Sequence, residues 1–295
     1  MLSQQFIVAP TVFLITAFIL SIILKGRSCN LVVSLLSATA SLLMIWIGLD
    51  VLLTNRSLSY SIILYRVKGL TLGLNRLIFT VDHLSALFSI ALGILGFAVS
   101  IYAIKYMDLY VGHESLRFFG INYSSFLLMM YLVITAYDIV WFIVFWELMT
   151  VTSQFLVSFE KERPVARAAG YKYFFMAKAG SELIIVFILI VIIYLTRFDT
   201  SFDAIRYTLS LLARAYPGVT ALLFVILFIG LGVKAAIYPL HSWLPDAHSE
   251  APSNISALLS GIMVKMAVYM MARSFYWFAP SLIYVALNKP ILEVL

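Results

Sequence analysis

The sequence predicts an all-α, multi-pass membrane protein with about eight transmembrane helices. Hydrophobic residues occupy 63% of the 295 positions and charged residues only 12%, and the mean hydropathy is +1.03. Soluble domains carry about twice that share of charged residues, and about 20 apolar residues span a bilayer. The expected spans are 6–24, 31–49, a run that follows 82–85 and ends near 104, 118–137, 139–159, 173–196, 219–238 and 254–272.

The chain divides into three units by composition. Residues 1–110 hold the first three spans, 111–275 hold spans four to eight, and 276–295 form a short C-terminal segment. The run at 6–24 has no preceding positive charge and no small-residue cleavage site after it, so we expect a retained helix and not a signal peptide. The single cysteine, Cys29, excludes a disulfide framework and any cysteine-ligated metal or cluster held by this chain alone.

Two connections have structure of their own. Between the second and third spans, at 56–81, Leu70, Leu72 and Leu74 alternate with polar residues, which predicts a small hairpin outside the membrane. Residues 197–216 repeat apolar side chains at helical spacing beside a charged face, which is typical of a helix lying in the interface. Thr200 and Asp203 are expected to cap its start.

The basic residues suit membrane topology better than nucleic acid. They give a formal net charge of +6, but they are scattered among the connections and form no patch with interleaved aromatic residues. Lys and Arg are divided equally between alternate connections, so their bias does not set the orientation. The expected partner is therefore the lipid bilayer, with no nucleic acid.

Buried charges carry the functional prediction. A lysine in a span costs roughly 2.5–3.5 kcal/mol on insertion scales, so intramembrane charges are functional candidates. Lys234 and Lys265 lie in the seventh and eighth spans, and Glu147 lies near the centre of the fifth. Lys178 and Glu182 lie four residues apart in the sixth, on one helix face, where they can pair. These five residues are expected either to relay protons or to hold the bundle together as structural ion pairs.

The connection after the seventh span is expected to break the helix. Gly232 weakens the end of that span and Pro239 removes a backbone donor, as in the broken helices of transporters. The polar residues that follow are His241, Asp246, His248 and Glu250. Their spacing matches no metalloenzyme motif, so we expect helix breaking and capping here in preference to a metal site. The tryptophans, including Trp146 and Trp243, are expected at the lipid interface or in packing.

Four features together resemble one family. They are FWELMT at 145–150, a Gly-x-x-x-Lys pattern ending at Lys234, PLHSWLPDAH at 239–248, and Lys265. The set is similar to the antiporter-like proton-translocating subunits of respiratory complex I, Mrp cation/proton antiporters, membrane-bound hydrogenases and formate hydrogenlyases. The resemblance implies the first inverted repeat of that fold, with a relay of Glu147, Lys234, Lys265 and His241. It also implies an N-terminus on the outer side of the cytoplasmic membrane and, as partners, the other membrane subunits of a multi-subunit complex. No cofactor is expected on this chain.

The chain departs from the family in two respects. Family members have about fourteen helices in two repeats, whereas about eight spans are found here, so we expect either a separate chain supplying the second repeat or a shortened paralogue. Lys178 stands where many relatives carry a different polar residue. The functions that remain open are a proton- or sodium-translocating subunit of a redox-driven complex without redox chemistry of its own, an Mrp-type antiporter subunit, and a non-conducting scaffold.

Overall fold

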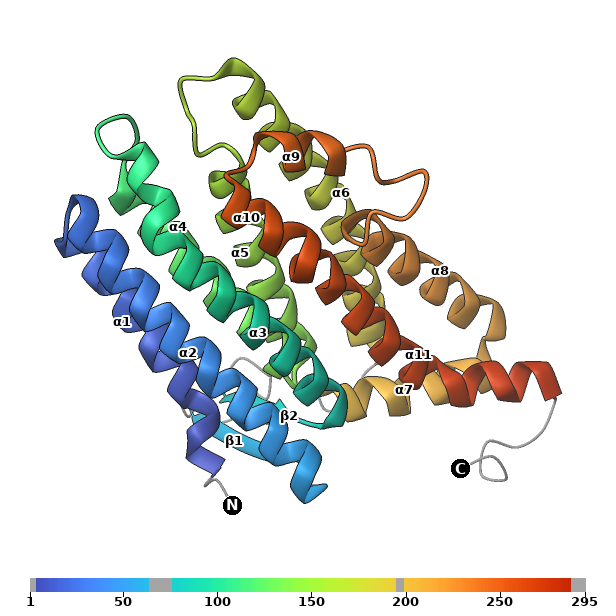
Figure 1. Ribbon diagram of the computed structural model, residues 1–295. Helices are drawn as coiled ribbons and strands as arrows, with labels where there is room; N and C mark the ends of the chain where they lie inside the picture. Colours follow the sequence, from blue (N-terminus) through green and yellow to red (C-terminus); the bar gives the residue numbers. More distant parts are fainter. Residues whose placement is uncertain (1–3, 64–75, 195–198, 288–295) are drawn as a thin grey trace.

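A computed structural model describes residues 4–63, 76–194 and 199–287. Within these ranges eight helical stretches are long and apolar enough to cross a membrane, which confirms the predicted fold class (Figure 1). They are Gln4–Ile23, Gly26–Thr54, His83–Tyr110, Leu116–Thr135, Ile139–Val157, Pro164–Tyr194, Pro217–Lys234 and Ser253–Ala279. The sixth begins at Pro164, nine residues before the predicted start at 173.

Helices α1 (Ala9–Ile23), α2 (Gly26–Thr54), α3 (His83–Tyr106) and α4 (Leu116–Thr135) form the N-terminal side of the bundle. Short 3-10 turns, Gln4–Val8 and Met107–Tyr110, precede α1 and follow α3. A Cβ atom on Gly93 would lie 2.6 Å from the carbonyl oxygen of Ser41. Gly93 therefore lets the backbone of α3 approach that of α2 closely. Such small residues matter in a membrane, because apolar side chains gain little by leaving lipid.

The structure contains a hairpin within the predicted region, 56–81. Strands β1 (Leu58–Ile63) and β2 (Arg76–Val81) pair antiparallel, with Leu58 opposite Val81. Leu58, Phe79 and Val81 are buried, so this apolar face of the hairpin packs on the bundle. The alternating leucines at 70–74 lie outside the described residues.

Helix α7 (Phe202–Ala215) has the predicted amphipathic character and lies across the end of the bundle (Figure 1). Its cap differs from the prediction. The hydroxyl of Ser201 accepts from the N–H of Ala204 at 3.3 Å, whereas Thr200 donates to Asp138 at 2.5 Å. Thr200 therefore ties α7 to the start of α5 (Ile139–Val157), which Asp138 caps through the N–H of Val140.

Helix α8 (Pro217–Lys234) packs against α6 (Pro164–Tyr194) through two facing glycines. A Cβ on Gly180 would lie 2.7 Å from the carbonyl oxygen of Gly230, and a Cβ on Gly230 would lie 2.8 Å from that of Gly180. Gly230 thus allows α8 to approach α6 closely.

The seventh span is broken as predicted, but it ends at Lys234 and not at residue 238. Ala236 takes a left-handed conformation with φ of 53°. The N–H of Ile237 bonds the carbonyl of Gly232 at 3.0 Å and the N–H of Ala236 bonds that of Val233 at 3.2 Å, which is the Schellman pattern of helix ends. Pro239 lies beyond this turn, in the connection to the short helix α9 (Leu244–Glu250).

The eighth span is one continuous helical rod with a π-helical turn. It comprises α10 (Ser253–Leu258), the π turn Leu259–Met263 and α11 (Val264–Leu287). The rod therefore continues past 272, the predicted end of the span, and past the unit boundary placed at 275. Within the described residues the hairpin and α7 lie at one end of the bundle, and α9 lies at the other (Figure 1). We call these ends the hairpin face and the α9 face.

Candidate functional site

Three of the predicted charges form a row across α5 and α6. The ammonium of Lys178 lies 3.0 Å from Oε2 of Glu147 and 3.1 Å from Oε1 of Glu182. The pairing of Lys178 with Glu182 confirms the prediction from their spacing, whereas the bond to Glu147 joins two helices. Oε1 of Glu147 is buried and has no hydrogen-bond partner among the described residues. The row runs from the half-buried Glu147 to Glu182, whose side chain is 55% exposed.

Lys234 is enclosed by protein side chains at the end of α8. The residue is only 1% exposed, and its ammonium lies 2.5 Å from Oγ1 of Thr150 and 4.9 Å from the centroid of the Trp146 ring. Among the described residues it makes no ion pair within 4.0 Å. The hydroxyl of Thr150 donates to the carbonyl of Trp146 at 3.0 Å, so its oxygen is free to accept from Lys234.

Aromatic residues pack around Lys234. The indole N–H of Trp243 donates to the carbonyl of Val233 at 2.8 Å, and its ring packs 4.8 Å from that of Tyr173. The hydroxyl of Tyr173 lies 2.7 Å from that of Ser153, one helical turn from Thr150. Trp146 and Trp243 are both buried, which confirms their expected role in packing and excludes the lipid interface for them.

Lys265 is not enclosed in this way. It is exposed on this chain and donates to the carbonyl of Ser260. Ser260 lies in the π turn, and π turns are often found at functional sites because they alter the regular bonding of the backbone. The structure therefore brings Glu147, Lys178 and Glu182 together, with Lys234 buried apart from them and Lys265 on the outside of the bundle.

The polar residues of the α9 face have individual partners. Asp246 pairs with Lys172 at 2.7 Å, Glu250 pairs with Arg163 at 3.0 Å, and Nδ1 of His248 lies 2.8 Å from the hydroxyl of Ser256. Burial, together with the positive charge of Lys265, holds the pKa of His248 below its ordinary value.

His241 packs 5.5 Å from the ring of Tyr238, and its Nδ1 is buried without a hydrogen-bond partner in the described chain. It lies in the connection between α8 and α9, seven residues after Lys234. His241 is therefore placed on the same broken segment as Lys234.

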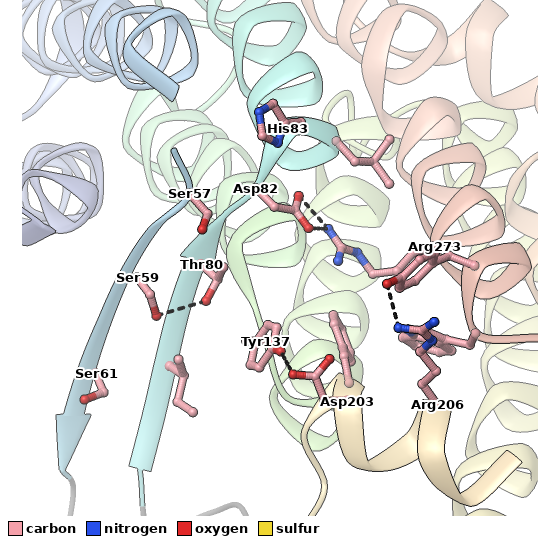
Figure 2. A pocket seen from close by; sticks show the side chains of 15 residues that line it. Ser57, Ser59, Ser61, Thr80, Asp82, His83, Tyr137, Asp203, Arg206 and Arg273 are labelled. Carbon is pink, nitrogen blue, oxygen red and sulfur yellow. Dashed lines mark hydrogen bonds and ion pairs between the residues drawn. The ribbon is translucent and has the colours of Figure 1, made fainter. Parts of the chain in front are cut away.

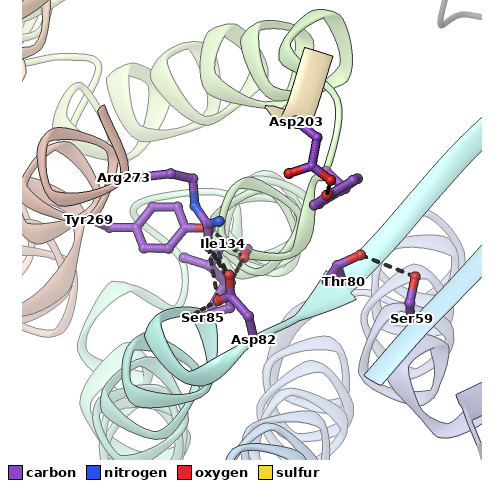
Figure 3. A network of polar contacts seen from close by, with 9 residues as sticks. Ser59, Thr80, Asp82, Ser85, Ile134, Asp203, Tyr269 and Arg273 are labelled. Carbon is purple, nitrogen blue, oxygen red and sulfur yellow. Dashed lines mark hydrogen bonds and ion pairs between the residues drawn. The ribbon is translucent and has the colours of Figure 1, made fainter. Parts of the chain in front are cut away.

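One polar site was missed by the sequence. Asp82 precedes the third predicted span and Arg273 follows the last residue of the eighth, 272, but their side chains meet at 2.9 Å (Figure 3). They lie on a cavity of about 810 Å³ at the hairpin face, bounded by β1, β2, α7 and α11 (Figure 2). The signal that could have found it is Arg273 itself, because apolar residues continue after it and place it inside the rod.

Comparisons with known proteins agree with this architecture. A structure of the membrane-bound sulfane sulfur reductase, an archaeal respiratory membrane complex, matches 93% of this chain and 53% of its own with a TM-score of 0.75 and 22% identity. A structure of the Mrp complex from Dietzia sp. DQ12-45-1b matches 92% of this chain and 48% of its own with a TM-score of 0.71 and 19% identity. At these identities the likeness concerns the fold.

Sequence relatives give the family. Hydrogenase-4 component B of Escherichia coli K12 is 38% identical over 189 residues, which are 64% of this chain and 27% of the relative. NADH-quinone oxidoreductase subunit M of the same organism is 31% identical over 196 residues, 65% of this chain and 38% of the relative. The chain thus spans well under half the length of these relatives. The profile of the NADH:quinone oxidoreductase/Mrp antiporter transmembrane family matches residues 136–292, more than half of the chain, and the chain therefore belongs to that family.

Proposed function

We propose that this chain is a proton-translocating membrane subunit of a redox-driven complex. The observation that carries the proposal is Lys234, an almost fully buried amine at the end of a broken helix that none of the described carboxylates contacts. A charge in such surroundings is costly unless a partner approaches it. Its protonation is therefore open to control by movement of a neighbouring carboxylate.

Glu147 is the neighbouring carboxylate. It lies on the same helix as Thr150, one turn away, and Lys178 holds only one of its two oxygens. The Thr150 oxygen accepts a hydrogen bond from either an ammonium or a neutral amine, so Lys234 keeps this contact in both protonation states. A shift of Glu147 from Lys178 toward Lys234 would stabilise the ammonium, and its return would release the proton.

The rest of the relay follows from position. His241 lies on the segment between Lys234 and α9 and supplies an imidazole to the proposed relay. Lys265 lies on the outside of the bundle beside the π turn. Its positive charge is close enough to act on the imidazole of His248. Lys178 and Glu182 are secondary members, and Asp246 contributes a surface ion pair with Lys172 at the α9 face.

The proposal includes partners. The chain matches about half of each solved subunit, so a segment or separate chain with the second repeat is proposed to cover the side that exposes Lys265. Sequence relatives named as hydrogenase and NADH-quinone oxidoreductase components favour an oxidoreductase complex of the cytoplasmic membrane as the setting. Electron transfer would then take place on other subunits.

An Mrp-type antiporter subunit is a second candidate. It is favoured by the structural likeness to the Mrp complex, at a TM-score of 0.71. Such a subunit would exchange cations without an electron donor. Imposed sodium gradients in vesicles distinguish the two functions, because only the antiporter acidifies or alkalinises the lumen without turnover.

The test is proton uptake by vesicles that contain the chain with its co-purifying subunits. Lys234→Ala and Glu147→Gln are expected to abolish uptake while assembly survives. Lys105→Ala, which removes a lysine that is 92% exposed, serves as the control and is expected to pump normally. Unchanged uptake in Lys234→Ala with loss of the complex on deletion of the chain would refute translocation and indicate a scaffold.

A further inference from the structure

The cavity at the hairpin face has an exposed rim and a buried floor. Ser59, Ser61 and Asp203 are exposed on its rim, whereas Arg273 is buried on its floor (Figure 2). Two further lining residues, Trp277 and Phe202, are also buried. Arg273 is 9% exposed and is the buried cation of the cavity floor. Solvent in the cavity therefore meets this guanidinium at the entrance to the bundle.

Arg273 is held in one position. Its Nη2 lies 3.0 and 2.9 Å from the two oxygens of Asp82 and donates to the hydroxyl of Ser85 at 3.1 Å (Figure 3). The rings of Tyr269 and Phe202 lie 5.0 and 5.4 Å from its guanidinium carbon. Asp82 also caps α3 by accepting from the N–H of Ser85 at 2.9 Å, so the carboxylate itself is fixed.

The hydroxyl groups behind Arg273 do not offer a proton path. The hydroxyls of Ser85 and Tyr269 both donate to the carbonyl of Ile134, at 2.7 and 2.9 Å. The Ser85 oxygen in turn accepts from Arg273. A guanidinium does not lose its proton in proteins, so a chain of hydrogen bonds that ends on it cannot pass protons along.

Lys265 lies further along the same rod. Tyr269 and Arg273 follow Lys265 by one and two turns, and eight residues rise about 12 Å along a helix. Arg273, at the hairpin face, thus lies two helical turns from Lys265, a proposed relay residue on the same helix. Positive side chains in pores exclude protons and cations.

We propose that Arg273, fixed by Asp82, is an electrostatic seal that closes the hairpin face of the bundle to protons and cations. The seal deepens the proposed function, since a translocating subunit needs one face closed to passive return. The guanidinium charge does the sealing, and Asp82 positions it. Asp82 and Arg273 have therefore unequal roles, although they form one ion pair.

The test uses passive proton leak. The full chain is reconstituted in liposomes with a pH-sensitive dye inside, the membrane potential is clamped, and the decay of an imposed pH gradient is timed without turnover. The pH gradient is expected to decay several times faster with Arg273→Gln than with the wild type. Arg273→Lys and Asp82→Asn keep the positive charge and are expected to remain tight. Arg206→Gln, an arginine substitution at the same cavity away from its floor, is the matched control.

A purely structural ion pair gives a different pattern. Removal of either partner would then cause the same proton leak. The double variant Asp82→Asn/Arg273→Gln, which leaves no unpaired charge, would show no increased leak. The seal instead predicts a leak in that double variant, which also covers the case in which Arg273→Gln alone does not fold. A tight double variant, or an Asp82→Asn as leaky as Arg273→Gln, overturns the seal. Normal pumping by Lys234→Ala would refute the relay and leave the leak result unaffected.

Discussion

The facing glycines of α6 and α8 allow a quantitative prediction. A methyl group on Gly230 would lie 2.8 Å from the carbonyl oxygen of Gly180 and 3.0 Å from Cγ1 of Ile184, whereas ordinary contact begins near 3.4 Å. The close atoms include backbone, which cannot rotate away, so α8 must move by several tenths of an ångström. Overpacking of this kind costs about 1–3 kcal/mol.

Gly218 in the same helix is the matched control, because a methyl group there meets nothing within 4 Å. Both substitutions gain helix propensity, up to about 1 kcal/mol. Gly230→Ala is therefore expected to be about 1–3 kcal/mol less stable to unfolding than Gly218→Ala, measured by denaturant titration in one detergent. Proton uptake should fall as well, because displacement of α8 lengthens the contact between Lys234 and Thr150. Equal stability of the two variants would refute this account of the contact.

Three further predictions concern the helix end and the ion pairs. Ala236→Gly should stabilise the protein by about 1 kcal/mol, because the left-handed conformation strains alanine but not glycine, whereas Ala235→Gly, at a right-handed position, should not; denaturant titration compares them. Although burial opposes its charged form, the Arg273 charge and the Ser85 bonds hold the pKa of Asp82 below its ordinary value. The contribution of the Asp82 carboxylate to the free energy of unfolding is therefore complete above the pKa of aspartate in the unfolded chain, near 3.9, and is lost as the pH falls. The difference in that free energy between wild type and Asp82→Asn should therefore narrow below about pH 4, as measured by denaturant titration. Lys178→Met should destabilise by about 1–3 kcal/mol through the unpaired Glu147, and adding Glu147→Gln should restore most of that in a double-mutant cycle.

Hydropathy and spacing were sufficient to predict the spans, the hairpin, α7 and the pair of Lys178 with Glu182. Each of these depends on residues close together in the chain. The bond from Lys178 to Glu147 joins positions 31 residues apart, so it depends on how α5 and α6 pack. No spacing rule gives such a contact.

The end of α8 shows why the exact helix break was misplaced. Proline is the residue that breaks helices most strongly, and Pro239 was therefore taken as the signal. The helix ends earlier because Ala236 adopts a conformation that usually belongs to glycine, and an alanine carries no sequence signal for it. Arg273 was misplaced for the opposite reason, because a charge was taken as the end of a span that in fact continues.

The place of Lys234 at the last residue of α8 bears on how the protein is made. A lysine at the end of an 18-residue apolar helix can reach the headgroup region during insertion, so it meets little of the penalty of a lysine at mid-span. Its burial requires α5, which supplies Thr150 and Trp146, and the segment with Trp243, which covers the helix end. The interior position of the charge thus depends on helix assembly and not on the insertion of α8 alone.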